Sequence, residues 1–282
     1  MTDRYAVIGN PIGHSKSPLI HGTFAKSTGQ DLEYIAIEGP LDGFTAAVAA
    51  FRTGGGYGMN VTAPFKLQAF ELATDRLPRA QLARAANCLK FECDRILADN
   101  FDGVGLVNDI ERNAGVSLAG RRVLLIGAGG AAAGVLGPLL AARPRAVVVA
   151  NRSVTKALAL VERHAAVAGA AALSATGLDD CGDAFDVVVN ASSSSLQAAP
   201  VPVSSAVLAP GALALDMMYG AAARPFIDWA ATHGAQGRDG LGMLVEQAAA
   251  AFERWRGVRP ETAPVLAALR RRMDDAARRV SA

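Results

Sequence analysis

Residues 121–153 constrain the fold of this chain more than any other stretch, because they predict a complete β-α-β unit. An apolar strand over residues 122–126 runs into a glycine turn, a helix of small residues follows, and a second strand covers residues 146–150. The turn has a G-x-G-x-x-A pattern at Gly127, Gly129 and Ala132. Backbone N–H groups at such a turn can approach a pyrophosphate, which is held at the positive end of the helix. The stretch therefore predicts a parallel sheet that binds a dinucleotide.

Two other interpretations compete with this one. Glycines at the start of a helix often form only a turn, but here the strands before and after lie at the intervals that a dinucleotide-binding unit requires. Residues 123–142 also form an uncharged run of 20 residues, which is long enough for a membrane span. The run is mostly Ala and Gly, contains Pro138 and has no aromatic belt. We therefore interpret it as a buried strand followed by a helix that packs on a sheet.

The end of the second strand indicates which dinucleotide is bound. An NAD-binding unit usually has Asp or Glu there for the ribose 2′-hydroxyl, whereas an Arg accommodates the 2′-phosphate of NADP. This chain has Asn151 and Arg152 at that place and Lys156 one helical turn later. Two cations without a carboxylate favour NADP. The alternative is that both are solvated charges at the start of a helix, which is common for Arg and Lys.

Length and composition predict two well-packed domains. The chain has 282 residues, of which 51% are hydrophobic and 19% charged. This length exceeds the usual single domain, and this composition excludes a largely disordered chain. The net charge of +2 is too balanced for a nucleic-acid-binding surface, and residues 270–272, all Arg, share a helix with Asp274 and Asp275. That helix face is predicted to be solvated.

Cysteine usage and the N-terminal residues indicate the compartment. Cys88, Cys93 and Cys181 are odd in number and have no C-x-x-C spacing, so we expect neither a disulfide framework nor a metal site. No apolar segment for secretion precedes the strand that begins at Tyr5. We expect a cytoplasmic protein with no membrane and no nucleic acid among its partners.

Strand and helix signals alternate along most of the chain. Besides the two strands above, the expected strands cover residues 5–9, 32–37, 57–61, 88–91, 96–100, 185–190 and 212–217. The expected helices cover residues 17–27, 41–52, 104–114, 154–166, 242–255 and 264–280. The first helix has Ser17 and Pro18 as its N-cap and N1 pair. This alternation predicts an α/β fold with a parallel, doubly wound sheet.

Polar side chains follow several expected strands, where open α/β sheets bind their ligands. Thr62 and Lys66 follow one strand, Asn87 precedes another, and Asp102 follows a third. A lone Lys is most often a surface charge, and a lone Asp is usually a cap or turn residue. A dehydrogenase, however, needs a proton donor or acceptor beside its hydride path, and Lys66 with Asp102 could form that pair.

A series of motifs extends along nearly the whole chain. In order, the motifs are NPIGHSKSPLIH from Asn10, NVTAPFK from Asn60, AAN from Ala85, DNFDGVG from Asp99, GAGGAA from Gly127, NRS from Asn151, DMMY from Asp216 and DGLGMLVEQAAAAF from Asp239. Such a set in this order is highly specific, and it resembles the shikimate dehydrogenase family. The resemblance implies an NADP-dependent enzyme that reversibly reduces 3-dehydroshikimate to shikimate in aromatic amino-acid (chorismate) biosynthesis.

The resemblance also implies roles for residues at matching positions. Lys66 would act as the general acid/base, paired with Asp102. The substrate would be bound through its carboxylate by Ser15 and Ser17, through its ring hydroxyls by Thr62, Asn87, Asp102 and Gln247, and also by Tyr219. The NADP cofactor would contact Gly127, Gly129, Gly130, Ala131, Asn151, Arg152, Ser153, Lys156, Ser192, Met217 and Gly240.

Two domains are implied by the same resemblance. An N-terminal α/β domain over residues 1–103 would bind the substrate and carry the catalytic groups, completed by C-terminal helices over residues 240–282. Residues 104–239 would form a Rossmann-type NADP-binding domain with a parallel sheet. The oligomeric state stays open, a homodimer included.

Several residues depart from the family pattern. Lys156 stands where the family often has Arg, and Lys is a point charge without the fork of a guanidinium. The other departures are Gly22, Cys88, Ala133, Ser195 and Arg224. None of them removes a proposed catalytic group.

Two alternative functions stay open. A quinate/shikimate dehydrogenase would also accept quinate or NAD. A non-catalytic sensor of a metabolite or dinucleotide could have kept the fold, although Lys66, Asp102 and the serine pair argue against it.

Overall fold

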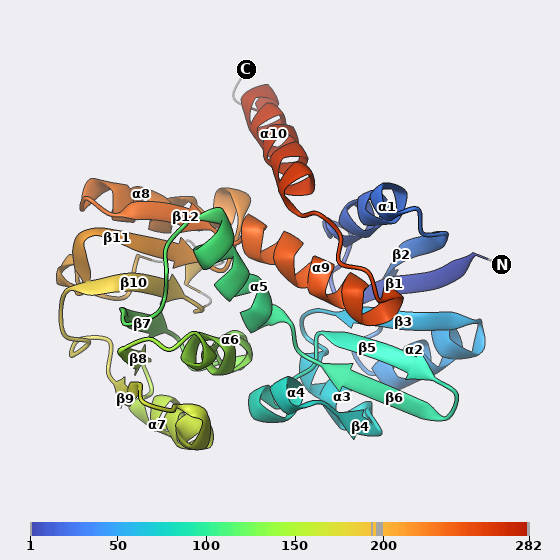
Figure 1. Cartoon of the computed structure of the whole chain (residues 1–282), viewed down its shortest axis with the longest axis horizontal. Coiled ribbons are helices and arrows are strands. Elements are labelled where there is room, and N and C mark those ends of the chain that lie inside the picture. Colours follow the sequence, from blue (N-terminus) through green and yellow to red (C-terminus); the bar gives the residue numbers. More distant parts are fainter. Residues whose placement is uncertain (1, 193, 196–199, 281–282) are drawn as a thin grey trace. The chain divides into compact units, whose positions relative to one another are not determined.

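The computed structural model describes residues 2–192, 194–195 and 200–280, without the side chains at positions 276, 277, 279 and 280. The chain forms two compact units, each with its own six-stranded sheet (Figure 1). The first unit consists of Met1–Asp102 and Val245–Ala268, and the second of Gly103–Leu244 and Leu269–Ala282.

The first unit is built on a mixed sheet. Its strands are β1 (Asp3–Gly9), β2 (Leu32–Glu38), β3 (Gly56–Val61), β4 (Asp75–Arg76), β5 (Cys88–Glu92) and β6 (Arg95–Asp99), in the order β2-β1-β3-β5-β6-β4. β1 runs parallel to β2 and β3, whereas β5 runs antiparallel to β3 and β6. The sequence predicted an α/β fold for this domain and did not give the strand directions. Glu92 pairs with Arg95 across a two-residue turn, and so short a connection can join only antiparallel strands.

Helices cover both faces of this sheet. They are α1 (Ser17–Thr28), α2 (Phe44–Thr53), α3 (Lys66–Leu72), α4 (Pro78–Ala83) and the parts of α9 (Leu241–Arg256) and α10 (Ala263–Val280) that belong to this unit. One face packs Ile8 and Met59 against Phe44, Phe51 and Phe65. Because side chains alternate along a strand, the other face carries a separate aromatic layer, formed by Tyr5, His21, Phe24, Tyr34, Phe252 and Trp255.

The start of α1 differs by one residue from the prediction. Ser17 was expected to be the N-cap, but Lys16 takes that position and Ser17 is the first helical residue. The Ser17 backbone N–H donates to Ser15 Oγ at 3.3 Å. The Ser15 hydroxyl thus serves the N–H of the first helical residue, and the Ser17 side chain interacts with the Tyr34 hydroxyl. Gly29 ends the helix in the left-handed conformation, as predicted.

The second unit is built on a parallel sheet. Its strands are β7 (Arg122–Ile126), β8 (Ala146–Ala150), β9 (Ala172–Thr176), β10 (Phe185–Asn190), β11 (Leu208–Asp216) and β12 (Gln236–Asp239), in the order β12-β11-β10-β7-β8-β9. All the paired strands of this sheet that the structure describes are parallel. The order reverses between β7 and β10, which makes the carboxyl ends of these strands the expected ligand site of a Rossmann-type fold.

Helices and helical turns connect these strands. They are α5 (Asp102–Asn108), a π-helical turn (Asp109–Asn113), α6 (Gly130–Ala141), α7 (Val154–His164), α8 (Arg224–Thr232) and short 3-10 turns at Ala165–Val167, Ser205–Val207 and Gly220–Ala223. The uncharged run at residues 123–142 is thus a strand and a helix, as predicted, and Val123 and Leu125 of β7 pack with Val135 and Leu139 of α6. Among the described helices, none combines the length and the apolar character that a bilayer crossing requires.

The two units divide the C-terminal region differently from the predicted domains. The prediction placed all of residues 240–282 with the substrate-binding domain. In the structure, α9 passes from the second unit to the first after Leu244, and α10 passes back after Ala268. In the second unit, Arg270 of α10 donates to Asp239 at the end of β12, with 2.7 Å between Nη1 and Oδ2.

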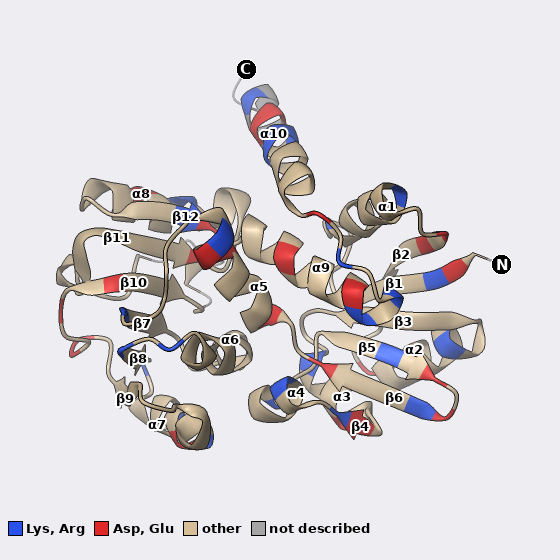
Figure 2. Ribbon diagram, viewed as in Figure 1, with Lys and Arg blue, Asp and Glu red and all other residues tan. Residues whose placement is uncertain are grey.

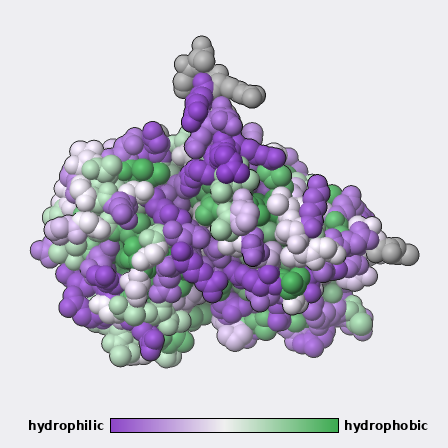
Figure 3. Space-filling view, turned by 45° about the horizontal axis from the view of Figure 1, so that its top comes forward, coloured by the Kyte–Doolittle hydropathy of each residue, from purple (hydrophilic) through white to green (hydrophobic). Residues whose placement is uncertain are grey.

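Charged residues of both signs are interspersed along the ribbon of each unit (Figure 2). On α10, Arg271, Arg272, Asp274 and Asp275 are exposed, and this helix has a hydrophilic surface in the space-filling view (Figure 3). The predicted solvated face is therefore present, except that Arg270 pairs with Asp239.

Candidate active site

A lysine and an aspartate at the starts of two helices form the centre of the candidate site. Lys66 is the first residue of α3, and Asp102 is the first residue of α5. Lys66 Nζ donates to Asp102 Oδ2 at 2.6 Å. The Asp102 side chain is 3% exposed and that of Lys66 is 29% exposed, so a buried carboxylate holds an ammonium that solvent can reach. Such an ammonium can donate a proton to the oxygen of a bound ligand.

Asn87 joins this pair to helix α9. Its Nδ2 donates to Asp102 Oδ1 at 2.9 Å and to Gln247 Oε1 at 2.8 Å. Its Oδ1 accepts from the backbone N–H of Phe101 at 2.9 Å. The structure therefore brings four predicted site residues, Lys66, Asn87, Asp102 and Gln247, into one hydrogen-bonded group within the first unit.

A second set of polar residues fixes the turn that carries Asp102, and sequence reasoning gave these residues no role. Arg79 Nε donates to Asp99 Oδ1 at 3.1 Å, and Asp99 Oδ1 also accepts from the Asn100 N–H at 2.8 Å. Asn100 Oδ1 accepts from the Asp102 N–H at 3.0 Å, and Asn100 Nδ2 donates to the Ala85 carbonyl at 3.1 Å. Asp99 and Asn100 open the DNFDGVG motif, so the motif itself was the available signal.

The remaining residues predicted for substrate binding are only partly buried. Ser15, Ser17 and Thr62 lie in loops or at a helix start in the first unit. Within the part of the chain that the structure describes, no hydrogen bond joins their side chains to the Lys66–Asp102 pair. Tyr219 belongs to the second unit, where burial raises the pKa of its hydroxyl.

The glycine turn after β7 has the geometry that a pyrophosphate needs. Gly127 has φ = +111°, which favours glycine, and its N–H donates to the Ala150 carbonyl at 2.7 Å. Gly129 is the N-cap of α6, and Gly130 is its first residue. A Cβ atom at either Gly129 or Gly130 would meet no atom within 4 Å. This open space, next to the free N–H groups of the helix start and to Ala131, fits a dinucleotide phosphate.

The end of β8 presents cations and no carboxylate. Asn151 Nδ2 donates to the carbonyl of Ser153, the N-cap of α7, at 2.9 Å. The side chains of Arg152 and Lys156 are exposed. These two cations can hold the 2′-phosphate of NADP.

A buried carboxyl group, that of Asp216, joins the carboxyl ends of β10 and β11. Asp216 accepts from the Ser195 hydroxyl, from Asn190 Nδ2 at 2.8 Å and from the Met218 N–H at 2.8 Å. Burial raises the pKa of Asp216, and these hydrogen bonds act in the opposite direction. The motifs contain Asp216, but sequence reasoning assigned it no role.

Three residues predicted for the cofactor surround this group. Ser192 Oγ donates to Asn190 Oδ1 at 2.7 Å, and the Met217 N–H donates to the Asn190 carbonyl at 3.0 Å. A Cβ at Gly240 would lie 2.3 Å from the Met217 carbonyl oxygen. Ser192, Met217 and Gly240 therefore lie together at the sheet edge where α/β folds bind dinucleotides.

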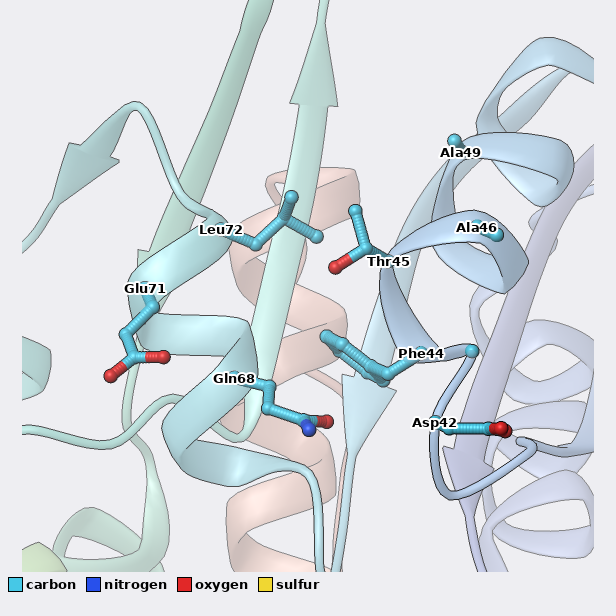
Figure 4. A pocket seen from close by; sticks show the side chains of 9 residues that line it. Asp42, Phe44, Thr45, Ala46, Ala49, Gln68, Glu71 and Leu72 are labelled. Atoms are coloured by element: carbon cyan, nitrogen blue, oxygen red, sulfur yellow. The ribbon is translucent and has the colours of Figure 1, made fainter.

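A separate hollow lies between α2 and α3 in the first unit (Figure 4). Its volume is about 510 Å³, and its lining includes the polar side chains of Asp42, Thr45, Gln68 and Glu71. None of the predicted site residues lines it.

Comparison with family models gives three matches along the chain. Residues 7–89 match the model described as "Shikimate dehydrogenase substrate binding domain", and residues 109–201 match "Shikimate / quinate 5-dehydrogenase". Residues 240–270 match "Shikimate 5'-dehydrogenase C-terminal domain".

Relatives and solved structures give the same result over nearly the full length. The shikimate dehydrogenase (NADP(+)) of Methylibium petroleiphilum is 58% identical over 95% of this chain and 94% of that protein. The protein of the same name from Acidovorax sp. (strain JS42) is 59% identical over 95% of this chain and 96% of its own length. Among solved structures, an Ael1 enzyme from Pseudomonas putida is 55% identical, with a TM-score of 0.89 and 95% and 98% of the two chains covered. The shikimate 5-dehydrogenase of Thermus thermophilus, solved with NADP(H) and shikimate, is 29% identical, with a TM-score of 0.83 and coverage of 96% and 99%.

Proposed function

The chain belongs to the shikimate dehydrogenase family, and we propose that it catalyses the NADPH-dependent, reversible reduction of 3-dehydroshikimate to shikimate, a step of aromatic amino-acid (chorismate) biosynthesis. The observation that carries the proposal is the Lys66–Asp102 pair, with 2.6 Å between Nζ and Oδ2. Asn87 and Gln247 extend this pair into a cluster of donors and acceptors suited to a polyhydroxylated ring.

In this proposal, Lys66 acts on the oxygen at C3 of the substrate. When bound, NADPH supplies the hydride for C3. In the reductive direction the Lys66 ammonium donates one proton to the C3 oxygen, which completes the hydroxyl, and in the oxidative direction the neutral amine takes the proton back. Asp102 holds the ammonium in place through its Oδ2 atom.

The other polar groups bind and orient the substrate. Thr62, Asn87, Asp102 and Gln247 bind ring hydroxyls, and Tyr219 contributes a further contact. Ser15 and Ser17 bind the carboxylate with their hydroxyls. The two serines are held close together, because Ser15 Oγ accepts from the Ser17 N–H at 3.3 Å. Two neutral hydroxyls bind a carboxylate less strongly than charged donors would.

NADP binds the second unit in this proposal. Gly127, Gly129, Gly130 and Ala131 receive the diphosphate, and Arg152 and Lys156 hold the 2′-phosphate beside Asn151 and Ser153. Ser192, Met217 and Gly240 lie on the nicotinamide side. We propose that residues 1–103 and 240–282 form the substrate-binding domain, and that residues 104–239 form the NADP-binding domain. A cytoplasmic location and a homodimer also stay predictions.

The first experiment removes the Lys66 amine. Purified protein should oxidise shikimate with NADP+, and Lys66→Ala should lower kcat by roughly 10²- to 10⁴-fold while shikimate still binds. Lys90→Ala is the matched control, because Lys90 is also partly exposed and paired with a carboxylate, Glu92 at 2.8 Å. Full kcat in Lys66→Ala would show that proton transfer belongs to another group.

A second candidate function is a quinate/shikimate dehydrogenase. One of the three matching family models carries quinate in its description, and Lys156 holds a phosphate less specifically than Arg does. Measuring kcat/KM for shikimate and quinate, each with NADP+ and NAD+, decides between the two. A larger value with NAD+ would contradict the role of Arg152. Tight binding of shikimate with no turnover would instead indicate a non-catalytic sensor.

A further inference from the structure

A partly buried chain of hydrogen bonds leads from the aromatic layer to Asn87. The Tyr34 hydroxyl donates to Asn60 Oδ1 at 2.7 Å, and Asn60 Nδ2 donates to the Asn87 carbonyl at 3.1 Å. The Asn87 side chain bonds both Asp102 and Gln247. Tyr34 is therefore connected to Asn87 through the Asn60 side chain, and its hydroxyl also interacts with the side chain of Ser17.

The strand register explains why a tyrosine makes this connection. Tyr34 lies on β2 and Asn60 on β3, with β1 between them. Tyr34 pairs with Tyr5 and Asn60 pairs with Val7 of β1, so both side chains point to the same face of the sheet. Strands are spaced about 4.8 Å apart, and only a long side chain can reach over β1 to the Asn60 amide.

Neighbouring aromatic rings hold Tyr34 in place. The His21 imidazole stacks on the Tyr34 ring, with centroids 4.2 Å apart and planes inclined by 3°. The Trp255 ring is tilted by 41° to the Tyr34 ring, with the two centroids 6.3 Å apart. Burial raises the pKa of Tyr34 well above its usual value, so the hydroxyl keeps its proton and remains a donor at working pH.

We propose that Tyr34 is a positioning residue for substrate binding, which acts by holding the Asn60 amide against the backbone of Asn87. The inference rests on the proposed function, in which Asn87 binds a ring hydroxyl. Without the Tyr34 hydroxyl, Asn60 Oδ1 loses its partner and the amide is free to turn its Nδ2 away from the Asn87 carbonyl. The Asn87 carbonyl then keeps the Val61 N–H, at 2.9 Å, and loses its second donor. Asn87 is held less firmly, and substrate binding weakens.

The test is Tyr34→Phe, which deletes the hydroxyl and keeps the ring. One lost hydrogen bond of this kind corresponds to a rise of about three- to tenfold in KM for shikimate. We expect kcat to stay within about twofold, because an interaction equal in ground and transition states affects KM alone. KM for NADP+ should not change, because the proposed cofactor residues belong to the second unit.

Tyr5→Phe is the matched control. Tyr5 is the register partner of Tyr34 and lies in the same aromatic layer, but its hydroxyl faces Arg256 at 3.5 Å. This variant should leave all three kinetic constants unchanged. If Tyr5→Phe raises KM for shikimate as much as Tyr34→Phe does, or if Tyr34→Phe leaves it unchanged, the proposal is overturned.

A double-mutant cycle with Asn60→Ala separates positioning from general destabilisation. If Tyr34 acts through Asn60, Tyr34→Phe should have no further effect on KM once Asn60 is Ala. A KM that rises by the product of the two single effects would refute the proposal, whatever the thermal stability of the variants. If the wild-type protein binds shikimate but does not turn it over, the proposed function is refuted. The role of Tyr34 can still be tested in that case, because the same double-mutant cycle can be measured as the Kd for shikimate by calorimetry.

Discussion

Lowering the pH from 7.5 to 5.0 should destabilise the first unit through one histidine. His21 is 1% exposed, and neither of its ring nitrogens has a hydrogen-bond partner among the described residues. Its neighbours are the aromatic rings of Tyr34, Phe24, Phe252 and Trp255. Burial lowers the pKa of His21 from 6.5 to about 3, with the nearby Asn60 side chain acting more weakly in the opposite direction.

The direction and the size of the change in unfolding free energy depend on the pKa of His21 in the unfolded and in the folded chain. The unfolded chain takes up a proton on His21 below pH 6.5, whereas the folded chain does not until the pH is near 3, so protons favour the unfolded state between these values. Between pH 7.5 and 5.0 the free energy of unfolding should fall by about 2 kcal/mol on account of His21. Because the folded-state pKa lies far below 5.0, this figure depends almost entirely on the pKa of the unfolded chain.

The assay is urea unfolding at the two pH values. Trp255 reports on the first unit and Trp229 on the second, so a Trp229→Phe background makes the fluorescence specific for the first unit. In this background, His21→Phe should reduce the pH dependence of the unfolding free energy by about 2 kcal/mol. His233→Phe, which removes an exposed histidine of the second unit, should leave that pH dependence unchanged. Equal pH dependence in His21→Phe and its parent would refute the reasoning.

Two further substitutions test the second unit. Arg152→Ala should raise KM for NADP+ by about ten- to a hundredfold, because a hydrogen bond to a charged group is lost. KM for NAD+ should stay unchanged, and equal effects on both cofactors would argue against a 2′-phosphate contact. Gly242→Ala would place a Cβ 1.8 Å from Oδ1 of the buried Asp109, which pairs with Arg238 at 2.6 Å, and disrupting this pair should cost about 3–5 kcal/mol in unfolding experiments. Gly22→Ala is its control: this helical glycine has nothing within 4 Å of a new Cβ, and alanine should stabilise the helix by about 1 kcal/mol.

The dinucleotide-binding unit could be predicted closely because its signals are local. The strands expected at residues 122–126 and 146–150 have the bounds of β7 and β8. Central strands of a parallel sheet are buried on both faces and read as continuous apolar runs. Gly127 then marks the turn without reference to any distant residue.

Elements with weak local signals were missed. The edge strand β9 has no fully buried residue, and β12 has four residues, of which only Asp239 is buried. Neither gives an apolar run or a clear alternation. The antiparallel β5 was predicted as a strand, but its direction depends on a two-residue turn that the alternating pattern does not reveal.

The sequence indicates the residue types of the site but not their partners. Lys66 and Asp102 could be paired because both follow expected strands, and the structure places them 2.6 Å apart; their chemical roles stay proposals. The bonds of Asn87 to Gln247 and of Asp109 to Arg238 join residues 160 and 129 positions apart. Periodicity and spacing carry no information on such pairs, and Gln247 entered only through the family resemblance.

The discontinuous first unit has a consequence for synthesis on the ribosome. Its sheet is complete at Asp99, but Trp255, which donates to the Leu89 carbonyl at 3.0 Å, and Phe252 of the aromatic layer are made much later. The last strand of the second sheet ends at Asp239, before either residue emerges. All the strands of the second unit's sheet are therefore synthesised before the part of α9 that covers the aromatic layer of the first unit. A nascent chain that stalls between Asp239 and Phe252 would expose His21 and Tyr34 as a surface for chaperones.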